Sequence, residues 1–154
     1  MTQPSDTQRP KITLLSLEKQ PWLDEMYRSL FDTIRAKADI NEITTSTAAD
    51  EMFNGSEKPS IILATDASLT TKEFCTQRDA AIRFVRSEGG TLIFGGSFPS
   101  FARPPDTKTT FAAFELPCES GDYHRTEFSV NNGCTSIRTT YFDNTIQSEG
   151  TVSR

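Results

Sequence analysis

The stretch Glu88-Gly89-Gly90-Thr91-Leu92-Ile93-Phe94-Gly95-Gly96-Ser97-Phe98-Pro99-Ser100 decides the fold of this chain. Its first two glycines are typical of the end of a helix. The four residues after them are β-branched or apolar, which predicts a short buried strand. The next two glycines predict a sharp turn that presents backbone N–H groups and the hydroxyl of Ser97. Because ligands of open α/β sheets lie beyond the carboxyl ends of strands, this turn marks the expected position of a site.

Outward from this stretch, strand-like and helix-like segments alternate. Short apolar or β-branched runs predict strands over 11–17, 40–45, 60–66 and 91–94, and alternation predicts a last strand over 126–130. Apolar residues at three- and four-residue steps predict helices over 22–37 and 71–88, and Ser46 or Thr47 would cap a shorter one through Phe53. This order, with short connections, favours a mainly parallel sheet with helices on both faces. The expected fold is therefore a three-layer, flavodoxin-like α/β fold.

The helix expected over 71–88 should bury one apolar stripe. The stripe consists of Phe74, Arg78, Ala81, Ile82 and Val85. Cys75 lies one residue off it and is expected to be a structural cysteine of a half-buried helix. Beyond Ser100 the pattern is weaker. There Pro104-Pro105 predicts a turn or an extended segment, and residues 111–116 predict at least one helical turn.

Composition and charge narrow the possible partners. The chain has 154 residues, a formal net charge of −5 and no cluster of Lys or Arg. A nucleic-acid face or a polybasic membrane anchor would need such a cluster, so neither partner is expected. The apolar runs are too short to span a bilayer, and residues 1–20 contain no secretory signal, so the expected location is the cytoplasm.

Polar residues gather at the two ends of the chain. Residues 1–10 are therefore expected to be disordered, residues 11–130 to form the α/β domain, and residues 131–154 to be a poorly ordered tail. The C-terminal part of the fold is then expected to be abbreviated or divergent, which would leave a sheet edge exposed. A homodimer contact could cover that edge.

Few residues in this chain are suited to metal or disulfide chemistry. The three cysteines, Cys75, Cys118 and Cys134, are odd in number and widely spaced, and His124 is the single histidine. These counts argue against a disulfide scaffold and against a zinc site with conventional ligands. The glycine pattern also lacks a dinucleotide fingerprint. Neither a metal nor a cofactor is expected.

Ser97 and His124 are the candidate catalytic residues. A hydroxyl on a turn after a strand could act as a nucleophile, and histidine is the natural general base near neutral pH. Asp122 or Glu127 could orient the imidazole. The plainer interpretations are a tight turn with a buried Ser97 and a surface histidine beside charged neighbours.

Four residues are candidates for binding a ligand: Gly95, Gly96, Ser97 and Asp66. Gly95 and Gly96 would let backbone N–H groups form a concave binding surface together with Ser97. Asp66 ends the strand expected over 60–66, so it could bind a cation or a ligand hydroxyl. The alternative for Asp66 is that it caps the loop 67–70.

The segment from Phe84 to Gly96 resembles the helix–Gly-Gly–strand–turn segment of class I glutamine amidotransferase-like domains, including the trehalose-utilisation type. The strand before it, Ile61-Ile62-Leu63-Ala64-Thr65-Asp66, fits the same scheme, and the resemblance covers residues 11–100. The chain is also similar to a group of uncharacterised fungal proteins of that fold. The stretches in common are Phe-Pro-Ser-Phe at 98–101 and Gly-Asp-Tyr-His-Arg-Thr at 121–126.

The resemblance implies a site at the turn after the strand over 91–94, but two positions depart from the active family. Active members carry a Cys in this turn and a His-x-Glu pair near the C-terminus. Here the turn carries Ser97, and two residues separate His124 from Glu127. The expected function is therefore non-catalytic binding of a small molecule or a partner. The alternatives are a serine hydrolase using Ser97 and His124, and a structural subunit that pairs through a sheet edge.

Overall fold

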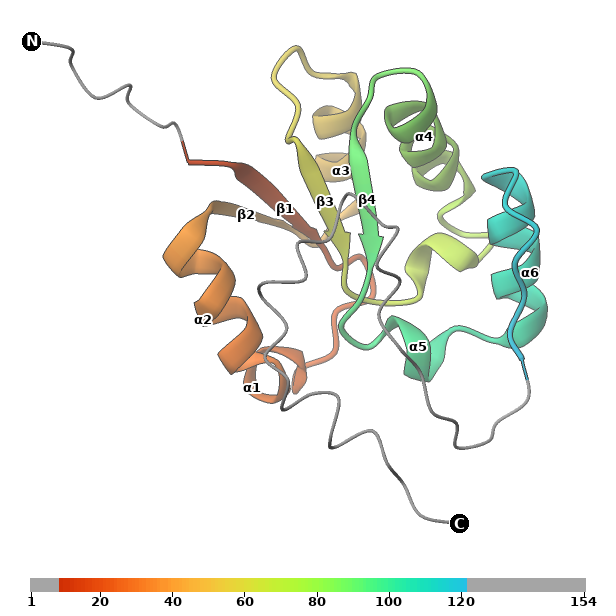
Figure 1. Cartoon of the computed structure of the whole chain (residues 1–154), viewed down its shortest axis with the longest axis horizontal. Helices are drawn as coiled ribbons and strands as arrows, with labels where there is room; N and C mark the ends of the chain where they lie inside the picture. The colour runs from red at the N-terminus through yellow and green to blue at the C-terminus, as the bar shows by residue number, and fades with distance from the viewer. Residues whose placement is uncertain (1–8, 122–154) are drawn as a thin grey trace, which may run out of the picture. The chain divides into compact units, whose positions relative to one another are not determined.

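The computed structural model describes residues 9–121, which contain a four-stranded parallel sheet (Figure 1). The strands are β1 (Lys11–Leu15), β2 (Asp39–Ile43), β3 (Ile61–Ala64) and β4 (Thr91–Phe94), in the order β2-β1-β3-β4. The chain steps from β1 outward to β2, crosses back to β3 and continues to β4. This is the flavodoxin-like order that the alternating pattern predicted.

Helices cover both faces of the sheet (Figure 1). They are α1 (Leu23–Met26), α2 (Arg28–Lys37), α3 (Ser46–Asn54), α4 (Cys75–Arg86), α5 (Phe98–Phe101) and α6 (Pro104–Ala113), with a 3₁₀ turn, η1, at Ser68–Thr70. Helices α1 and α2 pack on one face, and α3 and α4 pack on the other. The two glycines after α4 end it as predicted, because Gly89 adopts a positive φ of 73° and Gly90 N–H donates to the carbonyl of Phe84.

Each face of the sheet has its own hydrophobic core. Leu14 and Leu63 point to the α1/α2 face, where they meet Leu23 and Phe31. The neighbouring positions on the same two strands point to the larger core under α3 and α4, whose buried members are Leu15, Ile43, Ala49, Phe53, Ile62, Ala64, Leu69, Ala80, Ala81 and Phe84. Adjacent residues of β1 and β3 therefore serve opposite layers, as the two-residue period of a strand requires.

Several predicted boundaries differ from the structure. The helix expected over 22–37 is split at Tyr27, whose backbone (φ −104°, ψ 17°) leaves the helical region. The helix expected over 71–88 begins at Cys75, after η1. Pro104 and Pro105 begin α6 instead of forming a turn, because a proline fits the first helical position, where no N–H partner is needed. The strand expected over 126–130 lies outside the described residues.

The buried stripe of α4 also differs from the predicted one. Its buried residues are Gln77, Ala80, Ala81 and Phe84, while Ile82 and Val85 are half-buried. Cys75 is exposed, so it is not the structural cysteine that was expected. The physical reason is that the contact with the sheet and with α3 selects the buried face, and Phe53 of α3 meets Phe84 edge to face.

Candidate functional site

A cavity of about 240 Å³ opens at the carboxyl ends of β1, β3 and β4. This is the topological switch point of the sheet, where connections leave β1 and β3 in opposite directions, and where ligands of such sheets bind. Three loops line the cavity. The loop after β1 contributes Glu18 and Gln20, the loop after β3 contributes Asp66, Ala67, Thr70 and Thr71, and the segment after β4 contributes Ser97, Phe101, Arg103 and Asp106.

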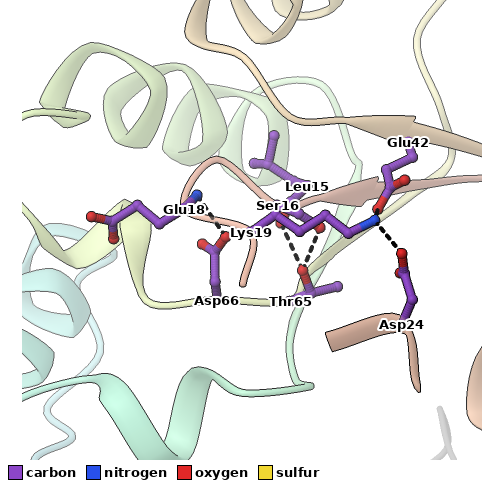
Figure 2. A network of polar contacts seen from close by, with 8 residues as sticks. All are labelled: Leu15, Ser16, Glu18, Lys19, Asp24, Glu42, Thr65 and Asp66. Atoms are coloured by element: carbon purple, nitrogen blue, oxygen red, sulfur yellow. Dashed lines mark hydrogen bonds and ion pairs between the residues drawn. The ribbon is translucent and has the colours of Figure 1, made fainter. Parts of the chain in front are cut away.

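A buried hydroxyl pair fixes the loops after β1 and β3 to each other (Figure 2). Ser16 Oγ and Thr65 Oγ1 are 2.5 Å apart, and both residues are fully buried. Thr65 Oγ1 also lies 3.4 Å from the carbonyl oxygen of Leu15. Backbone bonds continue beyond the strands, from Ser16 N to the Ile43 carbonyl and from Thr65 N to the Leu15 carbonyl. These bonds join the ends of β1, β2 and β3 at the residues that precede the cavity lining.

Asp66 holds the same two loops through backbone N–H groups. Its Oδ1 accepts from Ser68 N at 3.0 Å, which confirms that it caps the loop after β3. Its Oδ2 accepts from Glu18 N at 2.8 Å, a contact that the sequence pattern did not predict. The residue is 4% exposed, so a carboxylate is held almost entirely inside the protein by two backbone donors. Its role toward a ligand stays a prediction.

The turn after β4 folds back onto β3. Gly96 has a φ of 58°, and a Cβ at this position would lie 2.7 Å from the carbonyl oxygen of Thr65. The same carbonyl accepts from Ser97 N at 2.8 Å and from Ser97 Oγ at 2.9 Å. The hydroxyl of Tyr27 donates to the carbonyl of Gly96 at 2.9 Å. Gly96 is thus needed for this close approach, whereas a Cβ at Gly95 would meet only the terminal methyl group of Leu63, at 3.0 Å.

Ser97 lines the cavity but is 2% exposed, and its hydroxyl proton points to a backbone carbonyl. A serine nucleophile would need a base to accept that proton. His124 lies outside the described residues, so no distance joins it to Ser97. The catalytic pair stays a prediction.

Glu18 is the acidic group with a perturbed pKa at this site. Its partial withdrawal from water raises the pKa of the carboxyl, and the negative charges of Asp66 and Glu73 raise it further. No Lys or Arg of residues 9–121 forms an ion pair with Glu18. The β1 loop therefore presents a carboxylate whose charge the described part of the protein does not neutralise.

Lys19, the next residue, forms ion pairs with two other carboxylates. Its Nζ lies 2.8 Å from Asp24 Oδ2 and 2.7 Å from Glu42 Oε1, so it joins the β1 loop to α1 and β2. Figure 2 shows the side chains of Glu18 and Lys19 running in opposite directions. Partial burial lowers the pKa of Lys19, but hydrogen bonds to Asp24 and Glu42 outweigh it, and the net result is a raised pKa.

The segment after β4 provides the remaining wall. Phe101, at the end of α5, is 55% exposed and stacks on Trp22 with ring centroids 5.7 Å apart. Arg103 Nε donates to Asp106 Oδ2 at 2.6 Å across the first turn of α6. This wall combines an exposed aromatic ring with an ion pair that is already formed.

Of the four predicted binding residues, Ser97 and Asp66 line the cavity, whereas Gly95 and Gly96 do not. The N–H groups of Gly95 and Ser97 donate to the carbonyls of Ala64 and Thr65 instead of facing a ligand. The sequence pattern did not predict the loop after β1 or the segment 101–106. Ligands of open α/β sheets bind beyond the carboxyl ends of the strands, and this rule applies to β1 as well as to β4. The position of Glu18 after β1 could therefore have been predicted. The positions of Phe101 and Arg103 could not, because their approach depends on how α5 and α6 return to the sheet.

Within residues 9–121 no group of His, Cys, Asp and Glu side chains has the arrangement of a metal site. In the same part of the chain, every helix is too short or too polar to cross a bilayer. Comparison of the chain with protein families, with curated proteins and with solved structures found no match.

Proposed function

We propose that this domain binds a small polar molecule in the cavity at the carboxyl edge of its sheet and performs no chemistry on it. The observation that carries the proposal is the convergence of three separate loops on one cavity at the switch point of the sheet. Buried hydrogen bonds hold two of those loops, which is the preformed geometry that small-molecule sites usually have. The proposed domain is amidotransferase-like in architecture, without the family's nucleophilic cysteine.

The environment of Ser97 favours binding over hydrolysis. Its hydroxyl donates to the Thr65 carbonyl and is almost fully buried, whereas a nucleophile must be free to approach a substrate carbon. A fluorophosphonate probe tests this directly. The proposal expects no labelling of the full chain. Labelling that Ser97→Ala removes, or ammonia release from glutamine that Ser97→Ala abolishes, would instead make the domain a hydrolase.

Binding is tested by ligand-observed NMR on the full chain with a library of small cationic, neutral and anionic compounds. Gln20→Trp should block the cavity, because Gln20 is an exposed lining residue whose side chain bonds to one backbone carbonyl. Ser29→Trp, on the outer surface of α2, is the matched control. Compounds that bind the wild type and the control but not Gln20→Trp support the proposal. A library with no such compound contradicts it.

The outer edge of β4 supports a second candidate function, pairing with a second copy of the chain. Within residues 9–121 no strand follows β4 in the sheet. Its four residues carry no charge and Ile93 is 46% exposed, whereas β2 carries Asp39 and Glu42, and charges on an edge strand discourage pairing. Light scattering should then find a dimer that Ile93→Lys dissociates. A wild-type monomer at high concentration would exclude this candidate.

A further inference from the structure

The cavity at the carboxyl edge has an excess of negative charge. Its lining includes three carboxylates, on Glu18, Asp66 and Asp106, against one guanidinium on Arg103. That guanidinium is already bonded to Asp106. An anionic ligand would therefore enter against an uncompensated negative field, whereas a cation would be attracted.

The excess charge is concentrated at Glu18. The negative charges of Asp66 and Glu73 act on its carboxylate, which has no cationic partner among residues 9–121, since Lys19 binds Asp24 and Glu42. Asp66 cannot turn away to relieve the repulsion, because both of its oxygens accept backbone N–H groups. A positively charged group placed beside Glu18 would remove this repulsion.

The aromatic wall of the cavity is a second, independent observation that favours a positively charged ligand. Phe101 lines the cavity with more than half of its surface exposed, and Trp22 fixes the ring by stacking on it. An exposed phenyl ring attracts cations through its π face and also packs against apolar groups. A ring that lines the same cavity as the unpaired carboxylate of Glu18 is a combination suited to an organic ammonium ion.

We propose that the cavity binds a small organic amine in its protonated form, with the ammonium group beside Glu18 and an apolar group against Phe101. This inference rests on the proposed binding function and names its ligand class. The volume of about 240 Å³ limits the ligand to a small molecule. A carboxylate or phosphate on the ligand would oppose binding, so free amino acids and nucleotides are disfavoured.

The test uses three probes of similar size that differ in charge: phenethylammonium, 2-phenylethanol and phenylacetate. Amide chemical-shift titration of the full-length protein gives a Kd for each. The ammonium should bind about tenfold more tightly than the alcohol, and phenylacetate should bind most weakly. Shifts should appear in the loops after β1 and β3 and around Phe101.

Two variants assign the roles, and one variant controls for net charge. Glu18→Gln should weaken phenethylammonium binding about fivefold and leave 2-phenylethanol unchanged. Phe101→Leu should weaken both probes. Glu25→Gln, which removes one negative charge from exposed α1, should change neither Kd by more than about twofold. Thermal melts establish that each variant is folded.

The outcomes separate the two proposals. If the alcohol or phenylacetate binds in the cavity as tightly as the ammonium, the amine assignment is wrong while the binding function stands. The same holds if Glu18→Gln leaves the ammonium affinity unchanged. If no probe of any charge shifts the cavity resonances, and the wider library also gives no binding that Gln20→Trp removes, the proposed function itself is wrong.

Discussion

At the scale of single residues, a substitution at Gly96 should destabilise the turn after β4 strongly. Gly96→Ala would place a Cβ 2.7 Å from the Thr65 carbonyl oxygen and force an alanine to adopt a φ of 58°. We expect a loss of about 3 kcal/mol in unfolding free energy, from left-handed strain and the clash together. Gly89→Ala is the control, because its φ is 73° but nothing lies within 4 Å of the added Cβ, so about 1 kcal/mol is expected. Urea unfolding compares the two, and equal losses would contradict the clash.

Glu18 makes the stability of the fold depend on pH, and its environment determines the sign of that dependence. Its pKa in the folded protein lies above the ordinary value of 4.5, because burial and the charges of Asp66 and Glu73 disfavour the carboxylate. The stability that protonation of Glu18 contributes is therefore fully present below pH 4.5, and it is lost as the pH rises through the pKa of the folded protein. Glu18→Gln should melt at a higher temperature than the wild type at pH 7 and at the same temperature below pH 4. Melting curves that stay parallel from pH 3.5 to 7 would contradict this.

At the scale of elements, Lys19 connects the loop after β1 to α1 and to β2. Lys19→Met removes ion pairs to Asp24 in α1 and Glu42 in β2, and the side chain of Lys19 is 21% exposed. We expect a loss of about 1 kcal/mol at low salt, because the partners are largely solvated. The loss should shrink in 1 M NaCl, where such pairs are screened. Urea titrations at both salt concentrations measure it. A loss that salt does not change would mean that the packing of the lysine stem matters more than its charge.

At the scale of the whole molecule, the sheet couples its two cores. Phe31 belongs to the core under α1 and α2, and Phe84 belongs to the core under α3 and α4. Because Leu14 and Leu15 of β1 contribute to opposite cores, neither core can melt alone. Phe31→Ala and Phe84→Ala should each cost about 3–5 kcal/mol. In both variants, far-UV circular dichroism and Trp22 fluorescence should report one coincident transition. Separate transitions would show that the layers unfold independently.

Whether the sequence predicted an element correctly depends on how few neighbouring residues determine that element. The strand over 91–94 and the helix end at Gly89 were predicted at the right residues, because apolar runs and glycine conformations act over a few residues. The expected burial of that strand was wrong, because β4 ends the described sheet and Ile93 is 46% exposed. Cys75 was expected to be structural but is exposed, because it begins α4 and the buried face of that helix consists of Gln77, Ala80, Ala81 and Phe84. Tyr27 interrupts a pattern that reads as continuous, and its hydroxyl bonds to Gly96, far away in the sequence.

By itself, the sequence determined the α/β class, the order of the elements up to β4 and the turn at Gly95-Gly96-Ser97, since periodicity and glycine chemistry are local properties. The tertiary structure alone decided what meets at that turn. It turned the Ser97 hydroxyl toward the Thr65 carbonyl and brought Glu18 and Phe101 to one cavity. The physical reason is that parallel pairing brings the carboxyl ends of β1, β3 and β4 together, although long stretches of chain separate them.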